Sequence, residues 1–372
     1  MAANKMNVLH WHLVDSESFT YTSVKFPDLT GKGAYSKRHV YSRADIKSVI
    51  NYARMRGIRV VPEFDTPGHT AAWLGQPNFL TKCYDTHGNE ELQNLLDPSE
   101  EGTYTFLKDF FQEVVETFPE KMLHLGGDEV SGYSTPCWMR NQKIKDFMAK
   151  MGFTTADQVT AYYFERLHDI VQNLSQQRTS LMWQEAYDVY QPPVTDAVAH
   201  MWEGDYWYEY RDELLKLAKK GNRIIMSSCW YLNYIKYGAD WKANIDSQVE
   251  TRSRYYYCDP QDFNGTQAQL DLVIGGIVGM FGEFIDNTNL HTIMWPRASA
   301  ASERLWSPRD KTQDAELAWP RMHELRCRLV ARGYSISPNN FPDYCPFEYD
   351  ERRMYIPDAD KISEANEIPP AQ

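Results

Sequence analysis

Short runs of apolar and β-branched residues alternate with amphipathic patterns along most of the chain. Apolar residues at positions 46, 49, 50 and 53 recur with the period of a helix and predict one over 44–56. The same period predicts helices over 104–118, 156–174, 212–220 and about 320–332. Short apolar runs between these patterns predict strands over 6–13, 58–64, 122–125, 180–183, 197–202, 223–228 and 274–281.

Strands that alternate with helices are typical of a parallel sheet. We therefore expect an α/β fold, the (β/α)8 TIM barrel, although only seven strands are predicted. Nothing after residue 332 has the pattern of a strand, so the first strand is expected to precede Met1. Residues 1–335 would then form the catalytic barrel, with strands 2–8. The tail over 336–372, rich in Pro, Tyr and Asp, is expected to be an irregular extension.

Composition narrows the range of partners. The net charge is -12 and there is no block of Lys and Arg, which argues against a nucleic acid or an anionic membrane surface as partner. No apolar run approaches the roughly 20 residues of a membrane span. The aromatic content is 14%, with 11 Trp and 24 Tyr. Because aromatic rings stack on the apolar faces of sugars, this excess is compatible with a carbohydrate ligand.

The cysteines and two sequons favour an oxidising secretory route. No pair of cysteines has C-x-x-C spacing, so we expect no structural zinc. In the predicted map, three pairings join neighbouring loops or close a short one: Cys83–Cys137, Cys229–Cys258 and Cys327–Cys345. The sequons begin at Asn173 and Asn264. Residues 1–5 lack the apolar core of a signal peptide, so either the cysteines are reduced in a cytosolic protein or the chain begins inside a longer one.

Polar and aromatic residues lie at the carboxyl end of each predicted strand or directly after it. In TIM barrels the catalytic residues lie at these ends. The polar and aromatic residues are Asp15, Glu63, Asp65, His69, Asp128, Glu129, Trp183, Gln184, Glu185, Trp202, Glu203, the run 229–233 and Glu283. One acid at a strand end is explained by a helix cap. Acidic or amphipathic residues at all seven ends are better explained by a lined pocket.

The most specific motif is HLGGDE, residues 124–129. Its two glycines remove side chains beside an adjacent Asp–Glu pair, so a ligand can approach the backbone closely. Two neighbouring carboxylates repel each other, and one of them should hold its proton near neutrality and act as an acid. The alternative is a helix N-terminus at which the helix dipole favours two acids.

Six blocks, in order along the chain, resemble the β-N-acetylhexosaminidases of glycoside hydrolase family 20. They are HWHLVD at 10–15, PEFDTPGH at 62–69, HLGGDEV at 124–130, WQE at 183–185, WYLN at 230–233 and WPRA at 295–298. The resemblance is greatest to the lysosomal-type animal enzymes and runs from about Asn4 to Cys345. It implies a retaining exo-hydrolase that removes terminal GlcNAc or GalNAc. The resemblance also implies that the protein uses no metal and no cofactor. It further implies a homodimer and a lysosomal or secreted location.

The resemblance implies a substrate-assisted mechanism, an exception to the usual two-carboxylate scheme of glycosidases. The substrate's own acetamido oxygen attacks the anomeric carbon and forms an oxazolinium ion. By motif, Glu129 is the general acid and later the base, while Asp128 holds the acetamido N–H. Tyr231 donates to the acetamido oxygen, and Trp183 and Trp202 wall the acetamido pocket.

The remaining roles, and the departures from the family pattern, also come from the motifs. Asp15 and Glu283 would bind sugar hydroxyls, and His69 would support the acid. Family members carry an Arg on the first barrel strand, which is not among the predicted strands here. Phe281 stands where the family usually has a Trp in the pocket wall, and the position of Asn233 varies between Asp and Asn. A neutral Asn there is expected to tolerate anionic sugars.

Two rival interpretations remain open. A metal-dependent hydrolase is suggested by His10-x-His12, with His124 and His200 as further ligands, but no bridging Lys is evident and the last strand offers Glu283 where an Asp is expected. A catalytically impaired, sugar-binding relative is the non-enzyme alternative. The preference between gluco and galacto sugars and the natural substrate stay open.

Overall fold

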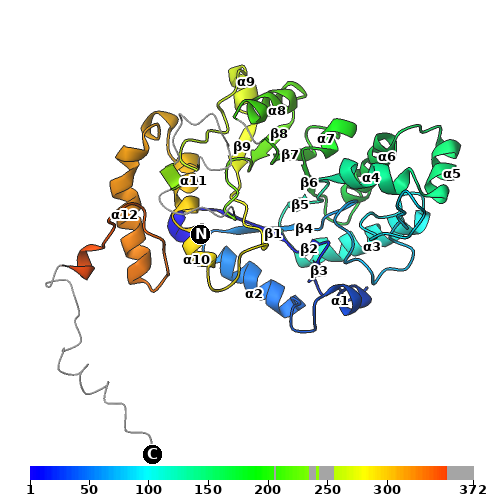
Figure 1. The fold of residues 1–372 in the computed structure, drawn as a ribbon, viewed down its shortest axis with the longest axis horizontal. Coiled ribbons are helices and arrows are strands. Elements are labelled where there is room, and N and C mark those ends of the chain that lie inside the picture. The colour runs from blue at the N-terminus through cyan, green and yellow to red at the C-terminus, as the bar shows by residue number, and fades with distance from the viewer. Residues whose placement is uncertain (205–206, 234–239, 243–254, 350–372) are drawn as a thin grey trace, which may run out of the picture. The chain divides into compact units, whose positions relative to one another are not determined.

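The computed structural model describes residues 1–204, 207–233, 240–242 and 255–349 (Figure 1). The chain forms two compact units. The first unit comprises Met1–Ser228 and Pro260–Ile277. The second comprises Cys229–Asp259 and the chain from Val278 onward, as far as these are described. The predicted division at residue 335, between a barrel and an extension, stays a prediction.

The first unit contains a curled sheet of seven parallel strands, a partial TIM barrel (Figure 1). Neighbours in the sheet follow chain order: β1 (Val8–His12), β4 (Arg59–Glu63), β5 (Met122–His124), β6 (Thr179–Trp183), β7 (Ala197–Met201), β8 (Arg223–Met226) and β9 (Val273–Gly276). All seven predicted strands are confirmed. The last is shorter than expected, because the sheet pairing stops at Gly276 rather than continuing to Phe281.

The register of the sheet brings functional side chains into one row. His12 pairs with Glu63, and Glu63 pairs with His124. Further along the sheet, Trp183 pairs with His200. Since these positions lie at or near the carboxyl ends of their strands, the residues predicted to line a site lie at one edge of the sheet.

The predicted helices of the first unit are confirmed, with shifts at their ends. They are α2 (Arg43–Arg54), α3 (Glu101–Thr117), α6 (Ala156–Gln172) and α8 (Trp207–Lys219). Capping boxes begin two of them: Ser42 with Asp45 at α2, and Thr155 with Gln158 at α6. Helix α2 packs against β4, α6 against β6, and α8 against β7 and β8.

Shorter elements were not predicted from the sequence. The expected long loop before α2 contains β2 (Val14–Asp15), β3 (Ser18–Phe19) and α1 (Asp28–Gly33). The other unpredicted elements of this unit are η1 (Ala2–Asn4), α4 (Val130–Trp138), α5 (Gln142–Met151), α7 (Ala186–Val189) and α9 (Gln267–Leu270). Helix α4 begins directly after Glu129, so the Asp–Glu pair does lie at a helix N-terminus.

Much of the high aromatic content fills the core rather than a binding site. Phe110 of α3 lies edge-on to Phe64, Trp73 and Phe19, with ring centroids 4.9–6.1 Å apart across this cluster. These rings are almost fully buried. The cluster packs α3 under the segment that follows β4, and so supports the loop that carries His69.

The second unit is mainly helical. Its elements are η2 (Asp240–Lys242), α10 (Leu290–Met294), α11 (Arg297–Trp306), η4 (Arg309–Lys311), α12 (Ala315–Ala331) and η5 (Pro346–Glu348). Helix α12 was expected to begin at about Pro320, but it begins at Ala315, where the Asp314 side chain accepts the N–H of Glu316. The described part of the tail is irregular apart from η5, and its remainder, 350–372, lies outside the described residues.

All three predicted disulfides are present: Cys83–Cys137 in the first unit, and Cys229–Cys258 and Cys327–Cys345 in the second. The side chains of both sequon asparagines, Asn173 and Asn264, are exposed. No helix within the described ranges combines the length and the apolar character that crossing a bilayer requires.

Removal of Cys83–Cys137 is expected to cost more stability than removal of Cys327–Cys345. The first closes a separation of 54 residues and the second one of 18. Loop-closure entropy then gives losses of about 4 and about 3 kcal/mol. Denaturant unfolding of the two paired Cys→Ala variants measures the difference. A Cys83→Ala/Cys137→Ala protein as stable as the parent would contradict it.

Candidate active site

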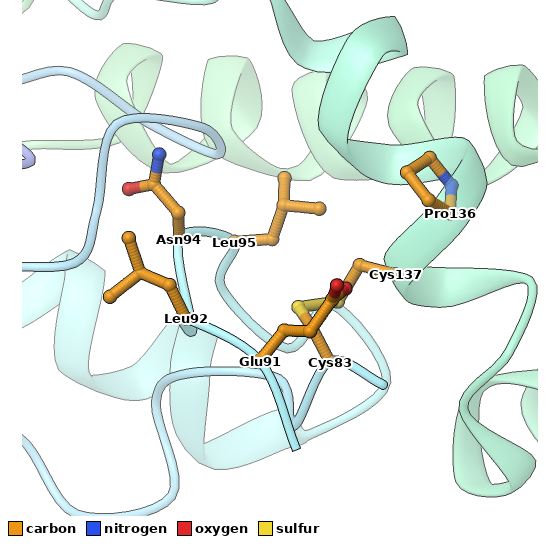
Figure 2. Close-up of a pocket in the computed structure, with 7 residues that line it drawn as sticks. All are labelled: Cys83, Glu91, Leu92, Asn94, Leu95, Pro136 and Cys137. Atoms are coloured by element: carbon orange, nitrogen blue, oxygen red, sulfur yellow. A yellow bond between two sulfur atoms is a disulfide. The ribbon is translucent and has the colours of Figure 1, made fainter. Parts of the chain in front are cut away.

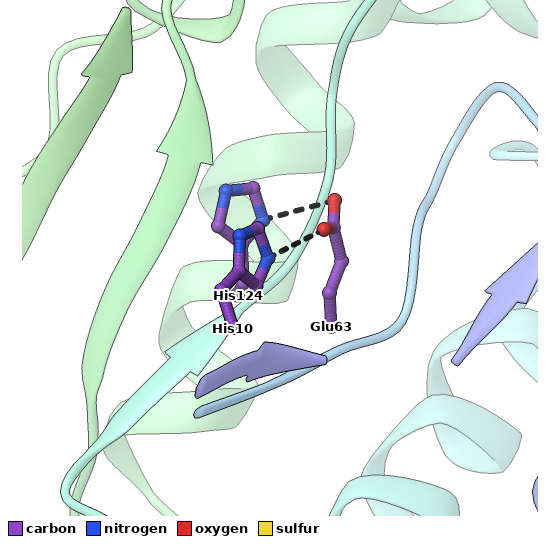
Figure 3. A group of neighbouring side chains, drawn as sticks. All are labelled: His10, Glu63 and His124. Atoms are coloured by element: carbon purple, nitrogen blue, oxygen red, sulfur yellow. Dashed lines mark ion pairs between the residues drawn. The ribbon is translucent and has the colours of Figure 1, made fainter. Parts of the chain in front are cut away.

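A buried carboxylate, Glu63 at the end of β4, is the centre of the sheet edge (Figure 3). One of its oxygens lies 2.7 Å from His10 Nε2 and 2.8 Å from His12 Nδ1. The other lies 3.1 Å from His124 Nδ1 and accepts the indole N–H of Trp183 at 2.9 Å. Burial alone would raise the pKa of Glu63, but the three imidazoles hold it well below its ordinary value.

The histidines around Glu63 have different charges. Burial would lower the pKa of His12, yet Glu63 and Asp15 raise it well above its ordinary value, so His12 is an imidazolium. Burial lowers the pKa of His124 to about 4 and that of His200 well below its usual range, so both are neutral. The Nε2 of His124 lies 3.1 Å from His200 Nδ1, and His200 Nε2 lies 3.0 Å from the Ser227 hydroxyl.

A chain of ion pairs leads from this centre to the Asp–Glu motif. His12 Nε2 lies 2.7 Å from one oxygen of Asp15, and His69 Nδ1 lies 3.1 Å from the other. His69 Nε2 in turn lies 3.3 Å from Glu129 and 3.6 Å from Asp128. Burial would lower the pKa of His69, but Asp15 and the motif carboxylates raise it to about 9. His69 therefore presents a positive charge to both motif acids.

The two glycines of the motif make close approaches that no other residue could make. Gly126 and Gly127 have φ angles of +74° and +104°. A Cβ on Gly126 would collide with the carboxylate of Asp65, and one on Gly127 would lie 2.7 Å from the ring of Phe164. The Gly127 N–H donates to Asp65 at 3.0 Å. The glycines thus press the backbone of the motif against Asp65.

Asp65 and Asp128 form a hydrogen-bonded carboxyl pair. Burial, followed by the charges of Asp128 and Glu63, raises the pKa of Asp65 well above its ordinary value. Burial also raises the pKa of Asp128, but His69 opposes that effect. Asp65 is therefore the member of the pair that more strongly favours its neutral form. The expectation that one of Asp128 and Glu129 holds its proton near neutrality stays a prediction, and the structure adds Asp65 as a further carboxyl group beside Asp128.

Glu129 lies at the start of α4 with a left-handed backbone, φ +53°. Its side chain is half exposed. Its backbone N–H donates to Glu185 at 3.0 Å. The motif thus directs one carboxylate inward, at Asp128, and one outward, at Glu129.

The predicted aromatic wall is held by neighbouring polar side chains. Trp183 stacks on His200 with ring centroids 4.0 Å apart, and it lies edge-on to Trp202 at 6.4 Å. The Trp202 indole N–H donates to Glu185 at 2.9 Å. Gln184 accepts the backbone N–H of Trp202 at 2.8 Å. These contacts fix both the backbone and the ring of Trp202.

The remaining predicted residues form a group in the second unit. Tyr231 and Phe281 stack with ring centroids 5.7 Å apart and an interplanar angle of 9°. The side-chain amide of Asn233 donates to Glu283 at 3.0 Å. The ten predicted catalytic and sugar-binding residues therefore fall into two groups, one in each unit. The sequence motifs assigned no role in the hexosaminidase reaction to His12, Glu63, Asp65 or Glu185. A period of two along β1 does place His10 and His12 on one face of the sheet, and this signal could have shown that they act together.

Two sets of side chains in the described part have metal-ligand atoms within 4.8 Å of one another: His10, Glu63 and His124, and Asp65, His69 and Asp128. In the first set both carboxylate oxygens of Glu63 already have partners, from the imidazoles and the Trp183 indole. In the second set His69 is cationic, which opposes a metal ion. The donor chemistry fits an ion-pair network better than a metal centre.

A small hollow lies beside the Cys83–Cys137 disulfide (Figure 2). Its lining includes Leu92, Asn94 and Pro136. The Asn94 side-chain oxygen accepts the Ser16 hydroxyl at 2.9 Å, so this hollow adjoins the loop that carries Asp15. None of the predicted catalytic or sugar-binding residues lines it.

Comparison with known proteins shows the family to which this fold and these motifs belong. The model of the glycosyl hydrolase family 20 catalytic domain matches residues 1–309. The chain belongs to glycosyl hydrolase family 20. It is 58% identical to beta-hexosaminidase A of Caenorhabditis elegans, over 94% of this chain and 63% of that protein. It is 43% identical to human beta-hexosaminidase subunit beta, over 94% of this chain and 59% of that subunit.

Solved structures of this family share the fold. The chitobiase of Flavobacterium johnsoniae superposes with a TM-score of 0.73 at 28% identity, over 89% of this chain and 48% of that one. A mutant Streptomyces plicatus beta-hexosaminidase in complex with its product GlcNAc gives a TM-score of 0.68 at 25% identity, over 91% and 66% of the two chains. This family 20 chain spans about three fifths of the length of its curated relatives.

Gly127→Ala is expected to destabilise the protein by about 3 kcal/mol. The new Cβ meets Phe164 and Ala186 at a backbone angle that side chains avoid. Gly132→Ala in α4 is the matched control, because a Cβ there meets nothing within 4 Å. It should be neutral or stabilise by up to about 1 kcal/mol. Thermal melts of both variants test this, and equal melting temperatures would contradict it.

Folding stability is expected to fall as pH rises from 6.5 to 9. Burial raises the pKa of Glu185 to about 8, and the stability linked to its neutral form is lost as pH rises through that value. The folded protein also keeps His69 charged up to about pH 9, whereas the unfolded chain releases that proton near 6.5. The lowered pKa values of His124 and His200 act only below 6.5.

Urea unfolding at pH 6.5, 8 and 9 measures this trend. Glu185→Gln removes one of the titrating groups, so it should reduce the fall between pH 6.5 and 8. A midpoint that rises across this range would show that the charges assigned to His69 and Glu185 are wrong.

Proposed function

We propose that this chain carries the catalytic site of a retaining exo-β-N-acetylhexosaminidase. The reaction removes terminal GlcNAc or GalNAc from glycoconjugates through an oxazolinium intermediate. The single observation that carries the proposal is the arrangement at the motif: an inward Asp128 and an outward Glu129, both facing the imidazolium of His69. Family membership supports the same reaction.

Glu129 is proposed as the general acid and then the base. Its carboxyl is accessible to a leaving oxygen because the left-handed turn directs it outward. The positive charge of His69, whose Nε2 lies 3.3 Å from Glu129, stabilises the carboxylate that proton donation creates. Glu129 then accepts a proton from the water that opens the oxazolinium ring.

Asp128 is proposed to hold the acetamido N–H and to stabilise the positive charge of the ring. The proton on Asp65 orients Asp128 and leaves its other oxygen for the substrate. A buried carboxylate acts strongly on a developing cation, because water does not screen the interaction. The rings of Trp183 and Trp202 are proposed to exclude that water around the acetamido group.

The roles of the second-unit residues are proposed from their motifs. Tyr231 would donate to the acetamido oxygen, Phe281 would pack on the sugar, and Asn233 and Glu283 would bind hydroxyls. The hydroxyl contact expected of Asp15 stays a prediction. Its carboxylate already accepts from Ser16 N–H and contacts His12 and His69, which supports a role in orienting His69.

The broader assignments rest on the relatives. We propose that one further strand closes the (β/α)8 barrel between β9 and β1, whose outer edges have no strand partner among the described residues. A homodimer and a lysosomal or secreted location are proposed from the animal beta-hexosaminidases. The three disulfides support an oxidising route.

Glu129→Gln is expected to lower turnover of a GlcNAc disaccharide by about 10²–10⁴-fold, because the sugar leaving group needs a proton. Turnover of 4-nitrophenyl N-acetylglucosaminide should fall less, since its leaving group departs more readily. Asp128→Asn should impair both substrates by about 10²–10³-fold, because the acetamido oxygen must displace either leaving group as the ring closes. Initial rates on the two substrates give these ratios.

Glu116→Gln on α3 is the control, since Glu116 is exposed and contacts only Gln112 among the hydrogen bonds described for its side chain. Its rates should equal those of the parent. A parent chain that binds GlcNAc and hydrolyses neither substrate would favour the sugar-binding alternative.

A further inference from the structure

Glu185 is the carboxylate that joins the acid and the aromatic wall. It follows the Trp183-Gln184 pair at the end of β6 and precedes the short helix α7. Because β6 lies between β5 and β7, a side chain at its end can reach the segments that follow both neighbours. Glu129 follows β5 and Trp202 follows β7.

The two oxygens of Glu185 have separate partners. One accepts the backbone N–H of Glu129 at 3.0 Å, and the other accepts the indole N–H of Trp202 at 2.9 Å. Both partners are pure donors. Both oxygens of a carboxyl group can accept a hydrogen bond, whether the group is ionised or carries its proton, whereas the amide of Gln presents one acceptor and one donor.

The contact with Glu129 acts on a strained backbone. A left-handed conformation is unfavourable for a residue with a side chain, and Glu129 has φ +53°. The backbone conformation of Glu129 decides where its side chain points, because a change in φ or ψ would move the carboxyl group relative to His69. The hydrogen bond from Glu185 holds the N–H of this turn in place.

The contact with Trp202 acts on a ring. Gln184 already fixes the backbone there, through the N–H groups of Trp202 and Glu203. Contacts of the backbone alone do not set the side-chain torsions of the indole. The bond to Glu185 selects one orientation, in which Trp202 lies edge-on to Trp183.

We propose that Glu185 is a positioning residue that sets the direction of the acid Glu129 and the orientation of Trp202 through one carboxylate. The proton donor Glu129 and the acetamido-wall residue Trp202 are thereby both hydrogen-bonded to the same side chain. The inference rests on the proposed hexosaminidase function. It adds a residue that neither contacts the substrate's reacting atoms nor exchanges a proton with them.

A double-mutant cycle tests the shared carboxylate. Glu185→Gln leaves one of the two N–H donors facing the amide N–H of Gln, so Glu129 or Trp202 should move. We expect kcat on the GlcNAc disaccharide to fall by about 10–100-fold, as rates do when a catalytic group is displaced by a small distance. KM should change by less than about threefold. Trp202→Phe removes the indole donor, and in that background the Gln carbonyl can serve the Glu129 N–H alone. The loss caused by Glu185→Gln should then shrink to about threefold or less.

A matched control separates positioning from stability. Glu120 also accepts backbone N–H groups, those of Lys121 and Met122, but it lies before β5, at the opposite end of that strand. Glu120→Gln should lower the melting temperature and leave kcat unchanged. Should Glu185→Gln not fold, Glu185→Asp replaces it, since the shorter carboxyl group keeps two oxygens and cannot span both donors.

Three results would overturn the inference. Equal falls of kcat in the parent and Trp202→Phe backgrounds would show that the two contacts act separately. A Glu185→Gln protein with a lowered melting temperature and parental kcat would show a purely structural role. A parent chain without turnover removes the proposed function and this inference with it, whereas an active parent with an unaffected Glu185 variant removes this inference alone.

Discussion

The site depends on one buried negative charge. A carboxylate in the interior is stable only when cations or donors surround it, and Glu63 has three imidazoles and an indole around it. These partners come from β1, β5 and β6, so the pairing also fixes the ends of neighbouring strands relative to one another. Loss of this centre would disturb His12 first, and through His12 the ion pairs that reach the motif.

Charges alternate outward from that centre. Glu63 is negative, His12 positive, Asp15 negative and His69 positive, and each neighbour keeps the next one ionised. The alternation delivers a cation, His69, to the carboxyl edge of the sheet. His69 therefore stays a cation beside Glu129 at a pH where a free histidine would be partly neutral.

Local patterns predicted the sheet because strands buried on both faces are short apolar runs, and the carboxyl ends of such strands carry the site. They overestimated β9, since the apolar run continues through Ile277 while the sheet pairing stops at Gly276. They also missed β2 and β3, two-residue strands with no measurable period. The role of Glu185 could not be predicted, because Glu203 has the same signature of an acid after a strand. Only the distances to Glu129 and Trp202 distinguish the two.

Glu63 and Asp65 show why protonation states cannot be predicted from sequence alone. They lie two residues apart and face the same side of the sheet, and both are fully buried. Glu63 meets imidazoles and is ionised, whereas Asp65 meets the carboxyl of Asp128 and keeps its proton. The first anchors a chain of charges, and the second donates a hydrogen bond that directs Asp128. Since both are acids with the same burial, their neighbours in space, brought by β5 and by the glycine turn, decide which task each performs.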